Sequence, residues 1–253
     1  MKNILVTGGV GFIGTNLIKK LVREGHKITS IDNYSTGTKS NEVKGVEYIN
    51  VDIALIDQLG SEFDICFHLA AQSRVQPSFE DPQESIRVNV TGTMKVMEWA
   101  KKYNVKVIYA GSSSKHNDPS DSPYAMTKFL GEEICKLYKK SFNVNVEISR
   151  FYNVYGPNEP LDEKFGNVIG IWREKVRLNK PLTIVGDGNQ KRDFTHVDDI
   201  IVGIVKIAFS YKKHNDAWEL GSGINYSINE LFNMFKERFN VISVNIDDQP
   251  GNY

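Results

Sequence analysis

The chain has 253 residues, with 31 Lys and Arg against 31 Asp and Glu, so its formal net charge is zero. Apolar residues make up 40% and charged residues 25%, which is typical of a soluble globular protein of one or two domains with a substantial core. This composition excludes disordered, collagen-like and coiled-coil chains, and the neutral balance gives no indication of a nucleic-acid partner.

Membrane and metal partners are not expected either. The longest apolar run, residues 200–205, ends at Lys206 and is far shorter than the ~20 residues that cross a bilayer. The first apolar run is interrupted by glycines and lacks the cleavage site of a signal peptide. Cys66 and Cys135 lie in apolar contexts without metal-ligand spacing, which favours buried, reduced thiols over a disulfide. We therefore expect a cytoplasmic protein without a metal site.

Short apolar runs alternate with stretches of helical spacing over the first two-thirds of the chain. Helical spacing marks residues 12–22 and 88–99, and Ser122 followed by Pro123 predicts the start of a further helix. The runs predict buried parallel strands at residues 3–7, 27–31, 46–51, 65–70, 105–110 and 144–149. Together they predict an α/β fold, a Rossmann-type doubly wound parallel sheet that binds ligands beyond the carboxyl ends of its strands.

The pattern changes after residue 155. Turn-rich segments at 156–160 and 186–189 separate helical stretches near residues 165–178, 198–210 and 228–239. We therefore expect a Rossmann domain over residues 1–155. Residues 156–253 should form a smaller lobe that is interleaved with the sheet and closes over the ligand.

A glycine-rich segment follows the first predicted strand and opens the first predicted helix. Gly8, Gly11 and Gly14 stand three residues apart: the first permits a tight turn, the second lets the backbone approach a pyrophosphate, and the third lets the helix pack closely. Amide groups at the helix N-terminus then face the phosphates. Asp32, at the end of the second strand, would bind a ribose and repel a 2′-phosphate, which favours NAD over NADP. Alternatively, the glycines serve only a turn, and Asp32 starts the turn before Asn33.

Three further residues point to proton transfer. Tyr124 and Lys128 are four residues apart and share one face of the helix that follows Pro123. An ammonium near a phenol lowers the pKa of the tyrosine and makes it a usable base near neutral pH. Ser112 belongs to a serine run at the carboxyl end of a predicted strand. Each feature alone is common in helices and loops, but their order after a dinucleotide motif predicts a catalytic group.

The chain resembles the extended short-chain dehydrogenase/reductases, in the NAD-dependent epimerase/dehydratase branch that acts on nucleotide sugars. The resemblance covers residues 1 to about 251 and is closest to UDP-galactose 4-epimerase-like enzymes. It implies that residues 1–155 bind NAD and residues 156–253 bind the sugar nucleotide. Besides the segments described above, the matching segments are residues 51–53, 68–72, 89–93, 150–157 and 186–199.

The resemblance implies a role for each motif residue. Tyr124 would be the catalytic acid/base, Lys128 its activator, and Ser112 the hydroxyl that binds the reacting sugar oxygen. The residues that would contact NAD are Gly8, Gly11, Phe12, Ile13, Asp32, Asn33, Asp52, Ile53, Leu69, Ala70, Ala71, Asn89, Tyr124, Lys128 and Tyr152.

Asn153 and Arg192 would contact the diphosphate of the substrate. A guanidinium suits this task because it can hold phosphate oxygens in a bidentate fork. Alternatively, Arg192 is a surface residue paired with Asp193.

The residues beside Ser112 help to choose a reaction. Dehydratases and uronate decarboxylases of the family carry a carboxylic acid near position 114, whereas Ser113 and Ser114 offer only hydroxyls. We therefore expect a UDP-hexose to be oxidised at C4 to a 4-keto intermediate and then reduced on its other face. A nucleotide-4-ketosugar reductase, a dehydratase of the same family and a non-catalytic NAD-binding protein remain open alternatives.

The sequence departs from the family pattern at three places. The connection from Ser112 to Tyr124 is short, and His116 replaces a common tyrosine, so it is either an extra proton donor or a solvated loop residue. Gln249 and Asn252 stand where relatives place an arginine and an acidic residue. We therefore expect a shortened C-terminal lobe with weaker nucleotide-sugar binding, either by nature or until another chain completes it.

A homodimer is expected as well. The helices predicted after residues 82 and 123 carry apolar side chains on more than one face. In the family these two helices pair across a dimer.

Overall fold

The computed structural model describes residues 1–248 and 250, and within them seven parallel strands form one sheet in the order β3-β2-β1-β4-β5-β6-β9. Because the order reverses between β1 and β4, the sheet is doubly wound, which confirms the predicted α/β fold. In chain order the strands are β1 (Asn3–Thr7), β2 (Lys27–Asp32), β3 (Glu47–Asn50), β4 (Ile65–His68), β5 (Lys106–Ser112), β6 (Val146–Phe151) and β9 (Trp218–Leu220).

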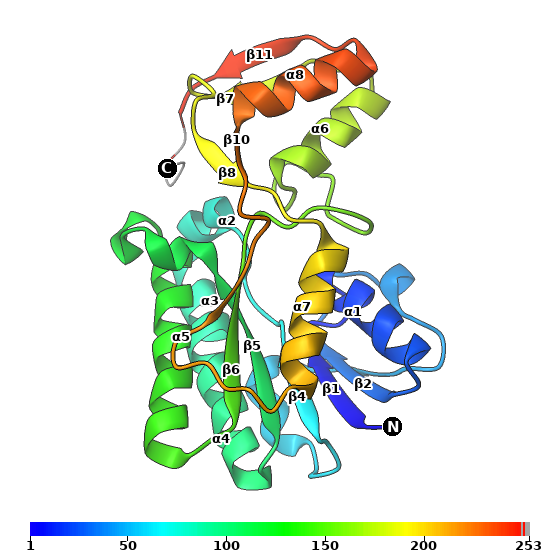
Figure 1. The fold of residues 1–253 in the computed structure, drawn as a ribbon, viewed down its shortest axis with the longest axis vertical. Coiled ribbons are helices and arrows are strands. Elements are labelled where there is room, and N and C mark those ends of the chain that lie inside the picture. Colours follow the sequence, from blue (N-terminus) through cyan, green and yellow to red (C-terminus); the bar gives the residue numbers. More distant parts are fainter. Residues whose placement is uncertain (249, 251–253) are drawn as a thin grey trace.

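Helices cover both faces of this sheet, because side chains of alternate residues in its strands are apolar on both sides. On one face α1 (Phe12–Arg23) and α7 (Val197–Phe209) pack over Ile4 and Val6. On the other face α4 (Thr93–Tyr103) and α5 (Pro123–Phe142) pack over Leu5 (Figure 1). Both cysteines are buried on this second face and unbonded, as predicted.

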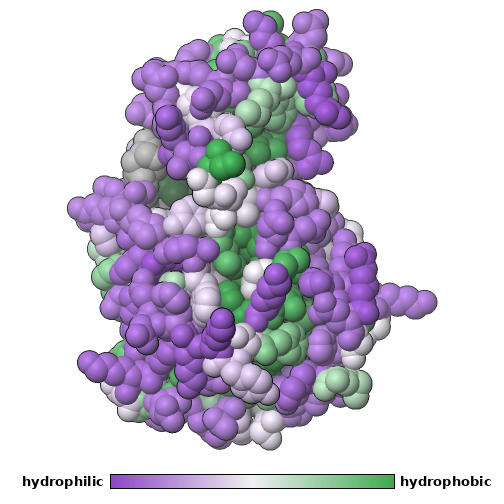
Figure 2. All heavy atoms as spheres, viewed as in Figure 1, coloured by the Kyte–Doolittle hydropathy of each residue, from purple (hydrophilic) through white to green (hydrophobic). Residues whose placement is uncertain are grey.

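Two elements from beyond residue 155, one strand and one helix, pack as part of the layer structure of the large sheet. Strand β9 extends it beside β6, and α7 covers one of its faces. Figure 2 shows apolar residues gathered over α7, with mostly hydrophilic residues around them. The second part of the chain is therefore interleaved with the first, and the expected division near residue 155 stays a prediction.

A smaller part lies beyond the carboxyl ends of the strands (Figure 1). Its core is Trp172, which contacts the rings of Phe232 and Phe235 at centroid distances of 6.2 and 5.3 Å. Strand β7 pairs with β11 in parallel, and β8 pairs with β10 in antiparallel. The elements of this part are α6 (Val168–Arg177), β7 (Leu182–Val185), β8 (Lys191–Asp193), β10 (Asn225–Ser227), α8 (Ile228–Phe239) and β11 (Ser243–Ile246).

Helix α5 begins where the sequence predicts. The Ser122 hydroxyl accepts a hydrogen bond from the amide of Ala125 at 3.1 Å, and Pro123 occupies the first turn. The helix ends at Phe142, and the following residue, Asn143, adopts a left-handed conformation that caps it. Tyr124 therefore lies in the first turn, directly beyond the end of the sheet.

The structure differs from the predicted elements mainly at their ends. The helix predicted at 88–99 begins with a π-helical segment (Arg87–Gly92) and continues as α4. Strand β5 extends past the predicted end at residue 110, because Gly111 and Ser112 still pair with β6. The strands of the smaller part were not predicted, because runs of three or four residues show no clear alternation. Gln249 and Asn252 lie outside the described residues, so the expected loss of substrate contacts stays a prediction.

Two short helices follow β4, lead toward α4 and pack against α5. They are α2 (Val75–Glu80) and α3 (Pro82–Ile86), and the Asp81 side chain caps the second of them through the amide of Glu84 at 2.9 Å. Among the described residues, no helix is long and apolar enough to span a bilayer.

Candidate active site

A cleft of about 1060 Å³ lies between the carboxyl ends of the strands and the smaller part. Its walls include the glycine-rich turn after β1, the ends of β2, β5 and β6, and β8. Every residue predicted to bind cofactor or substrate or to catalyse the reaction lines this cleft, with the exception of Asn89.

The glycine-rich turn shows why it needs residues without side chains. Gly8 has φ of +75°, and a Cβ there would lie 2.8 Å from the backbone nitrogen of Ala70. A Cβ on Gly14 would lie 2.2 Å from the Gly8 carbonyl oxygen. At Gly11, in contrast, a Cβ would meet only that oxygen, at 3.3 Å, and would otherwise enter open space in the cleft. The turn is therefore a bare backbone cradle at the start of α1, which fits a pyrophosphate.

Two alanine substitutions should separate the packing role of this turn from its binding role. Gly14→Ala is expected to lower the free energy of unfolding by about 1–3 kcal/mol, because its Cβ overlaps backbone atoms. Gly11→Ala is expected to leave unfolding unchanged but to weaken NAD binding by about tenfold or more, because its Cβ fills the cradle. Urea unfolding without NAD and calorimetric titration with NAD measure the two effects. Equal NAD affinity in Gly11→Ala and the wild type would contradict the cradle.

Asp32 and Asp52 mark the end of the cleft where the adenosine of NAD is predicted. The Asp32 carboxylate accepts hydrogen bonds from the amides of Val10 at 3.1 Å and Tyr34 at 2.8 Å, and burial raises its pKa. Asp52 accepts a bond from the Asn33 amide group at 3.0 Å and two from Arg87 at 2.8 and 3.0 Å. These bonds, above all those from Arg87, hold the pKa of Asp52 at about 2. Asp52 therefore stays ionised and ties this edge of the cleft to Arg87, a partner that the sequence did not indicate.

Asn89 lies behind the cleft wall. Its side chain is 1% exposed and bonds both the amide and the carbonyl group of Gln72, at 2.8 and 3.0 Å. It also donates to the Thr127 hydroxyl at 3.0 Å. In this structure Asn89 therefore holds the segment after β4 against α5, and its predicted contact with the cofactor remains untested.

Ser112, Tyr124 and Lys128 meet at the end of β5. The Tyr124 hydroxyl donates to Ser112 Oγ at 3.3 Å, and Ser114 Oγ donates to the same oxygen at 2.9 Å. Because Ser112 is the acceptor in both bonds, its own proton remains available to an oxygen in the cleft. The Lys128 ammonium donates to the Ala110 carbonyl, and it lies 4.6 Å from the centroid of the Tyr109 ring. A hydrogen bond thus joins the hydroxyl and the phenol, and the amine of Lys128 lines the same cleft; their catalytic roles stay a prediction.

Lys128 is deeply buried. Burial lowers the pKa of its ammonium group to about 8, although the carboxylate of Glu132 opposes part of this effect. This amine therefore changes charge close to neutral pH, in the range where a partner of a reactive phenol is effective.

Glu219, in the edge strand β9, bonds residues that form another wall of the cleft. Its carboxylate accepts from the Tyr152 hydroxyl at 2.7 Å and lies 3.2 Å from His116 Nε2. Arg150 donates to the same carboxylate at 2.7 Å. The rings of His116 and Tyr152 stack with their centroids 6.3 Å apart. His116 is therefore a half-exposed residue of the cleft that is tied to Glu219, and not a freely solvated loop residue.

Asn153 and Arg192 both line the cleft, and they come from segments about forty positions apart. Asn153 has φ of +28° and donates through its side chain to the Asp193 carbonyl at 3.1 Å, which links the end of β6 to β8. Arg192 lies in β8 and lines the cleft. The Asp193 carboxylate accepts from the amides of Ser222 and Gly223, each within 2.9 Å.

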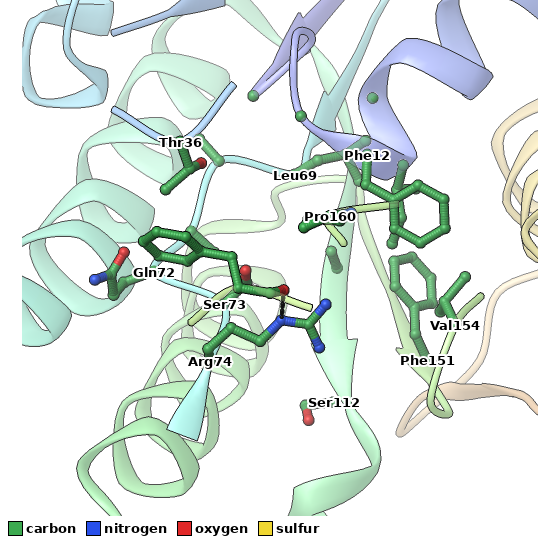
Figure 3. A pocket seen from close by; sticks show the side chains of 18 of the residues that line it. Phe12, Thr36, Leu69, Gln72, Ser73, Arg74, Ser112, Phe151, Val154 and Pro160 are labelled. Atoms are coloured by element: carbon green, nitrogen blue, oxygen red, sulfur yellow. Dashed lines mark hydrogen bonds between the residues drawn. The ribbon is translucent and has the colours of Figure 1, made fainter. Parts of the chain in front are cut away.

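Arg74 is a cleft residue that the sequence did not single out. In Figure 3 its guanidinium points into the cleft, and a dashed line joins its Nε to the Phe165 carbonyl, 2.6 Å away. The two residues are 91 positions apart in the chain, so no local pattern could have predicted their contact.

The doubly wound sheet and the glycine cradle define a Rossmann-type dinucleotide-binding protein. A sequence model of the NAD dependent epimerase/dehydratase family matches residues 4–221, and the chain belongs to that family. It is 34% identical over 265 residues to a protein provisionally named UDP-glucose 4-epimerase from Methanocaldococcus jannaschii, covering 98% of this chain and 86% of that protein. UDP-glucuronic acid decarboxylase 1 of Arabidopsis thaliana is 30% identical over 92% of this chain, which spans only 58% of the decarboxylase.

Solved structures of similar proteins include two epimerases. UDP-glucose 4-epimerase of Thermotoga maritima, solved with UDP-glucose, superposes with a TM-score of 0.91 at 27% identity, covering 99% of this chain and 87% of that one. UDP-glucuronic acid 4-epimerase of Bacillus cereus, solved with UDP-glucuronic acid and NAD, gives a TM-score of 0.86 at 29% identity, with 99% and 88% covered. The fold, the family and its dependence on NAD are thus established, and the particular reaction is taken up next.

Proposed function

We propose that the protein is an NAD-dependent epimerase that inverts C4 of a UDP-hexose. The observation that carries this proposal is the hydrogen bond from Tyr124 to Ser112 at 3.3 Å, with the buried Lys128 four residues further along the same helix. A base, its cationic partner and a donor to the sugar oxygen are the groups that reversible oxidation of an alcohol requires.

The cleft offers a place for each part of NAD. The glycine cradle would hold the pyrophosphate, Asp32 a ribose, and Tyr152 would lie near the nicotinamide end. When bound there, NAD supplies the hydride acceptor that oxidises C4 and the hydride donor that reduces it again.

The residues of the chain then handle the proton. Tyr124, as the phenolate, takes the proton of the C4 hydroxyl, and Ser112 donates a hydrogen bond to the same sugar oxygen. The positive charge of Lys128 favours the phenolate. In the second half of the reaction Tyr124 returns the proton to the oxygen on C4, so the enzyme ends in its starting state.

The relatives include both epimerases and decarboxylases, so the choice of reaction depends on the residues themselves. Removal of the C5 proton, which dehydration requires, needs a carboxylate near the reacting carbons. The residues after Ser112 in this chain are Ser113 and Ser114, and the Ser114 hydroxyl bonds Ser112 itself. This arrangement supports chemistry confined to C4.

The reaction is tested by incubating the NAD-loaded protein with UDP-glucose or UDP-galactose and separating the products by chromatography. We expect interconversion of the two sugars without a net change in nicotinamide absorbance. A ketosugar reductase would consume NADH stoichiometrically, and a dehydratase would release a 4-keto-6-deoxy sugar. NAD binding without conversion of any nucleotide sugar would indicate a non-catalytic protein and would refute the proposal.

The titration of Lys128 predicts two opposite pH effects. Its pKa is about 8 in the folded protein and 10.5 in the unfolded chain. Between these values the unfolded chain binds more protons, so the contribution of Lys128 to stability rises with pH, by up to about 1.4 kcal/mol per pH unit. Turnover should fall over the same range, because the neutral amine no longer attracts the phenolate.

Urea unfolding of the wild type and of Lys128→Met from pH 7 to 10 measures the effect on stability. The pH profile of kcat of the wild type measures the effect on turnover. The difference in unfolding free energy between the two proteins should rise above pH 8. A difference that stays constant, together with a flat kcat profile, would show that Lys128 does not titrate in this range.

The predicted homodimer also remains a proposal. Several large apolar side chains on the outer faces of α3, α4 and α5 are exposed, which would suit a helix-to-helix interface. They are Ile86, Met94, Met126, Leu130, Leu137 and Phe142.

A further inference from the structure

Arg74 lies in the cleft but has no part in the proton transfer described above. It immediately precedes α2, in the segment between β4 and that helix, and its Nε donates to the Phe165 carbonyl at 2.6 Å. That carbonyl is held in place by a tight turn, because Asp162 Oδ1 accepts from the amides of Lys164 at 3.0 Å and Phe165 at 2.8 Å. The guanidinium is thus anchored by one of its nitrogens across the mouth between the two parts of the molecule.

The other two nitrogens of Arg74 have no acceptor among residues 1–248 and 250. The nearby carboxylates form no hydrogen bond to these nitrogens. Glu159 Oε1 accepts from Arg173 at 2.6 Å, Glu159 Oε2 is buried without a hydrogen-bond partner among the described residues, and Asp162 is used by the turn. Burial lowers the pKa of Arg74, although the negative charges of Tyr124, Glu159 and Asp162 offset part of this effect. A guanidinium nevertheless stays charged in proteins, so a cation with a free pair of donors faces the cleft.

This cation lies at the reacting end of the cleft. Helix α2, which begins directly after Arg74, is joined to the first turn of α5 by a hydrogen bond from the Tyr124 amide to Ser78 Oγ at 3.0 Å. In Figure 3 the guanidinium head lies between the labelled Pro160 and Ser112. The residues proposed for the diphosphate, Asn153 and Arg192, belong instead to the end of β6 and to β8.

A partly buried cation in a cleft calls for an anion, and the two free N–H groups of a guanidinium match the two oxygens of a carboxylate. In a UDP-hexuronate the substituent on C5 is a carboxylate, which lies next to the reacting carbon C4. We propose that Arg74 is a specificity-determining residue that binds the sugar carboxylate of a UDP-hexuronate, which makes hexuronates the preferred substrates. This inference depends on the proposed C4 epimerase function and names the class of sugar that the same site takes.

The test compares two ligands that differ only at this group. Binding of UDP-glucuronate and UDP-glucose to the NAD-loaded protein is measured by calorimetry for the wild type, Arg74→Gln and Arg74→Lys. We expect Arg74→Gln to weaken UDP-glucuronate binding by about 10- to 100-fold, the value of a charge-assisted bond, and UDP-glucose binding by less than about threefold. Arg74→Lys, which keeps the charge but not the fork, should recover part of the loss.

Arg177→Gln is the matched control, because it removes the same charge from an exposed site on α6, where the arginine side chain is 68% exposed and pairs with Glu174. It should leave both affinities unchanged. Equal weakening of both ligands by Arg74→Gln would show that Arg74 binds the shared diphosphate, and unchanged affinity for both would show that it binds neither. Either result would overturn the inference.

Turnover assays distinguish this inference from the proposed function. If neither sugar is converted but Arg74→Gln still weakens only UDP-glucuronate, the epimerase proposal fails and the assignment of Arg74 stands. If both sugars are epimerised and the variant affects them equally, the assignment of Arg74 fails alone. Melting temperatures of all variants within a few degrees of the wild type would show that folding does not account for the differences.

Discussion

Tyr124→Phe is expected to lower the rate of epimerisation by roughly 10²- to 10⁴-fold or more, the range attributed to general acid–base help, while NAD binding is retained. The substitution removes the hydroxyl that donates to Ser112 at 3.3 Å and leaves the ring in the first turn of α5. The proton of the sugar hydroxyl then has no base, whereas the glycine cradle is untouched. Initial rates with UDP-glucose, UDP-galactose and their uronates, together with NAD titrations, measure the two effects.

Tyr103→Phe serves as the control for this experiment. Tyr103 lies at the end of α4, where it contacts the Trp99 ring, and it does not line the cleft. Its substitution should leave turnover unchanged. Near-normal epimerisation by Tyr124→Phe would remove the phenol from the mechanism, and a shared loss in both variants would point to general damage to the fold.

Arg150→Met is expected to cause the largest loss of stability. Arg150 and Glu132 are 2% and 0% exposed, and two guanidinium nitrogens of Arg150 bond the Glu132 carboxylate at 2.8–3.2 Å. Removal of the arginine leaves a buried carboxylate without its cation, which costs about 3–5 kcal/mol of unfolding free energy. Because Arg150 also holds Glu219, the position of Tyr152 in the cleft should be affected as well.

Two comparison variants test whether the loss of stability comes from the unpaired buried charge. Arg177→Met breaks an exposed pair with Glu174 and should leave the free energy of unfolding almost unchanged, because solvent screens exposed charges. The double variant Arg150→Met with Glu132→Gln should recover part of the loss, because no unpaired charge remains. Urea unfolding gives all three values. A loss for Arg150→Met as small as that for Arg177→Met would show that burial does not strengthen the pair.

The tertiary structure changes the interpretation of several single residues. His116 follows the serine run, and from the sequence it is either a proton donor or a solvated residue. The structure places it against Tyr152 and Glu219, which comes from a strand about a hundred residues later. The sequence predicts a cofactor contact for Asn89, and the structure shows that its side chain bonds Gln72 and Thr127 behind the cleft wall.

Features that depend on short spacings along the chain could be predicted from the sequence alone. Gly8, Gly11 and Gly14 form one turn, and Tyr124 and Lys128 share one helical face, whatever else the chain does. Regular apolar runs likewise predicted six of the seven strands of the large sheet, because buried parallel strands have a clear pattern.

Features that join distant segments became visible only in the folded chain. Arg74 reaches Phe165 across 91 positions, and Tyr152 reaches Glu219 across 67. Strand β9 and the two small sheets depend on partners far along the chain, and each strand is too short to be recognised alone. The physical reason is that local spacing determines which face a side chain occupies, whereas its partner depends on how the whole chain packs.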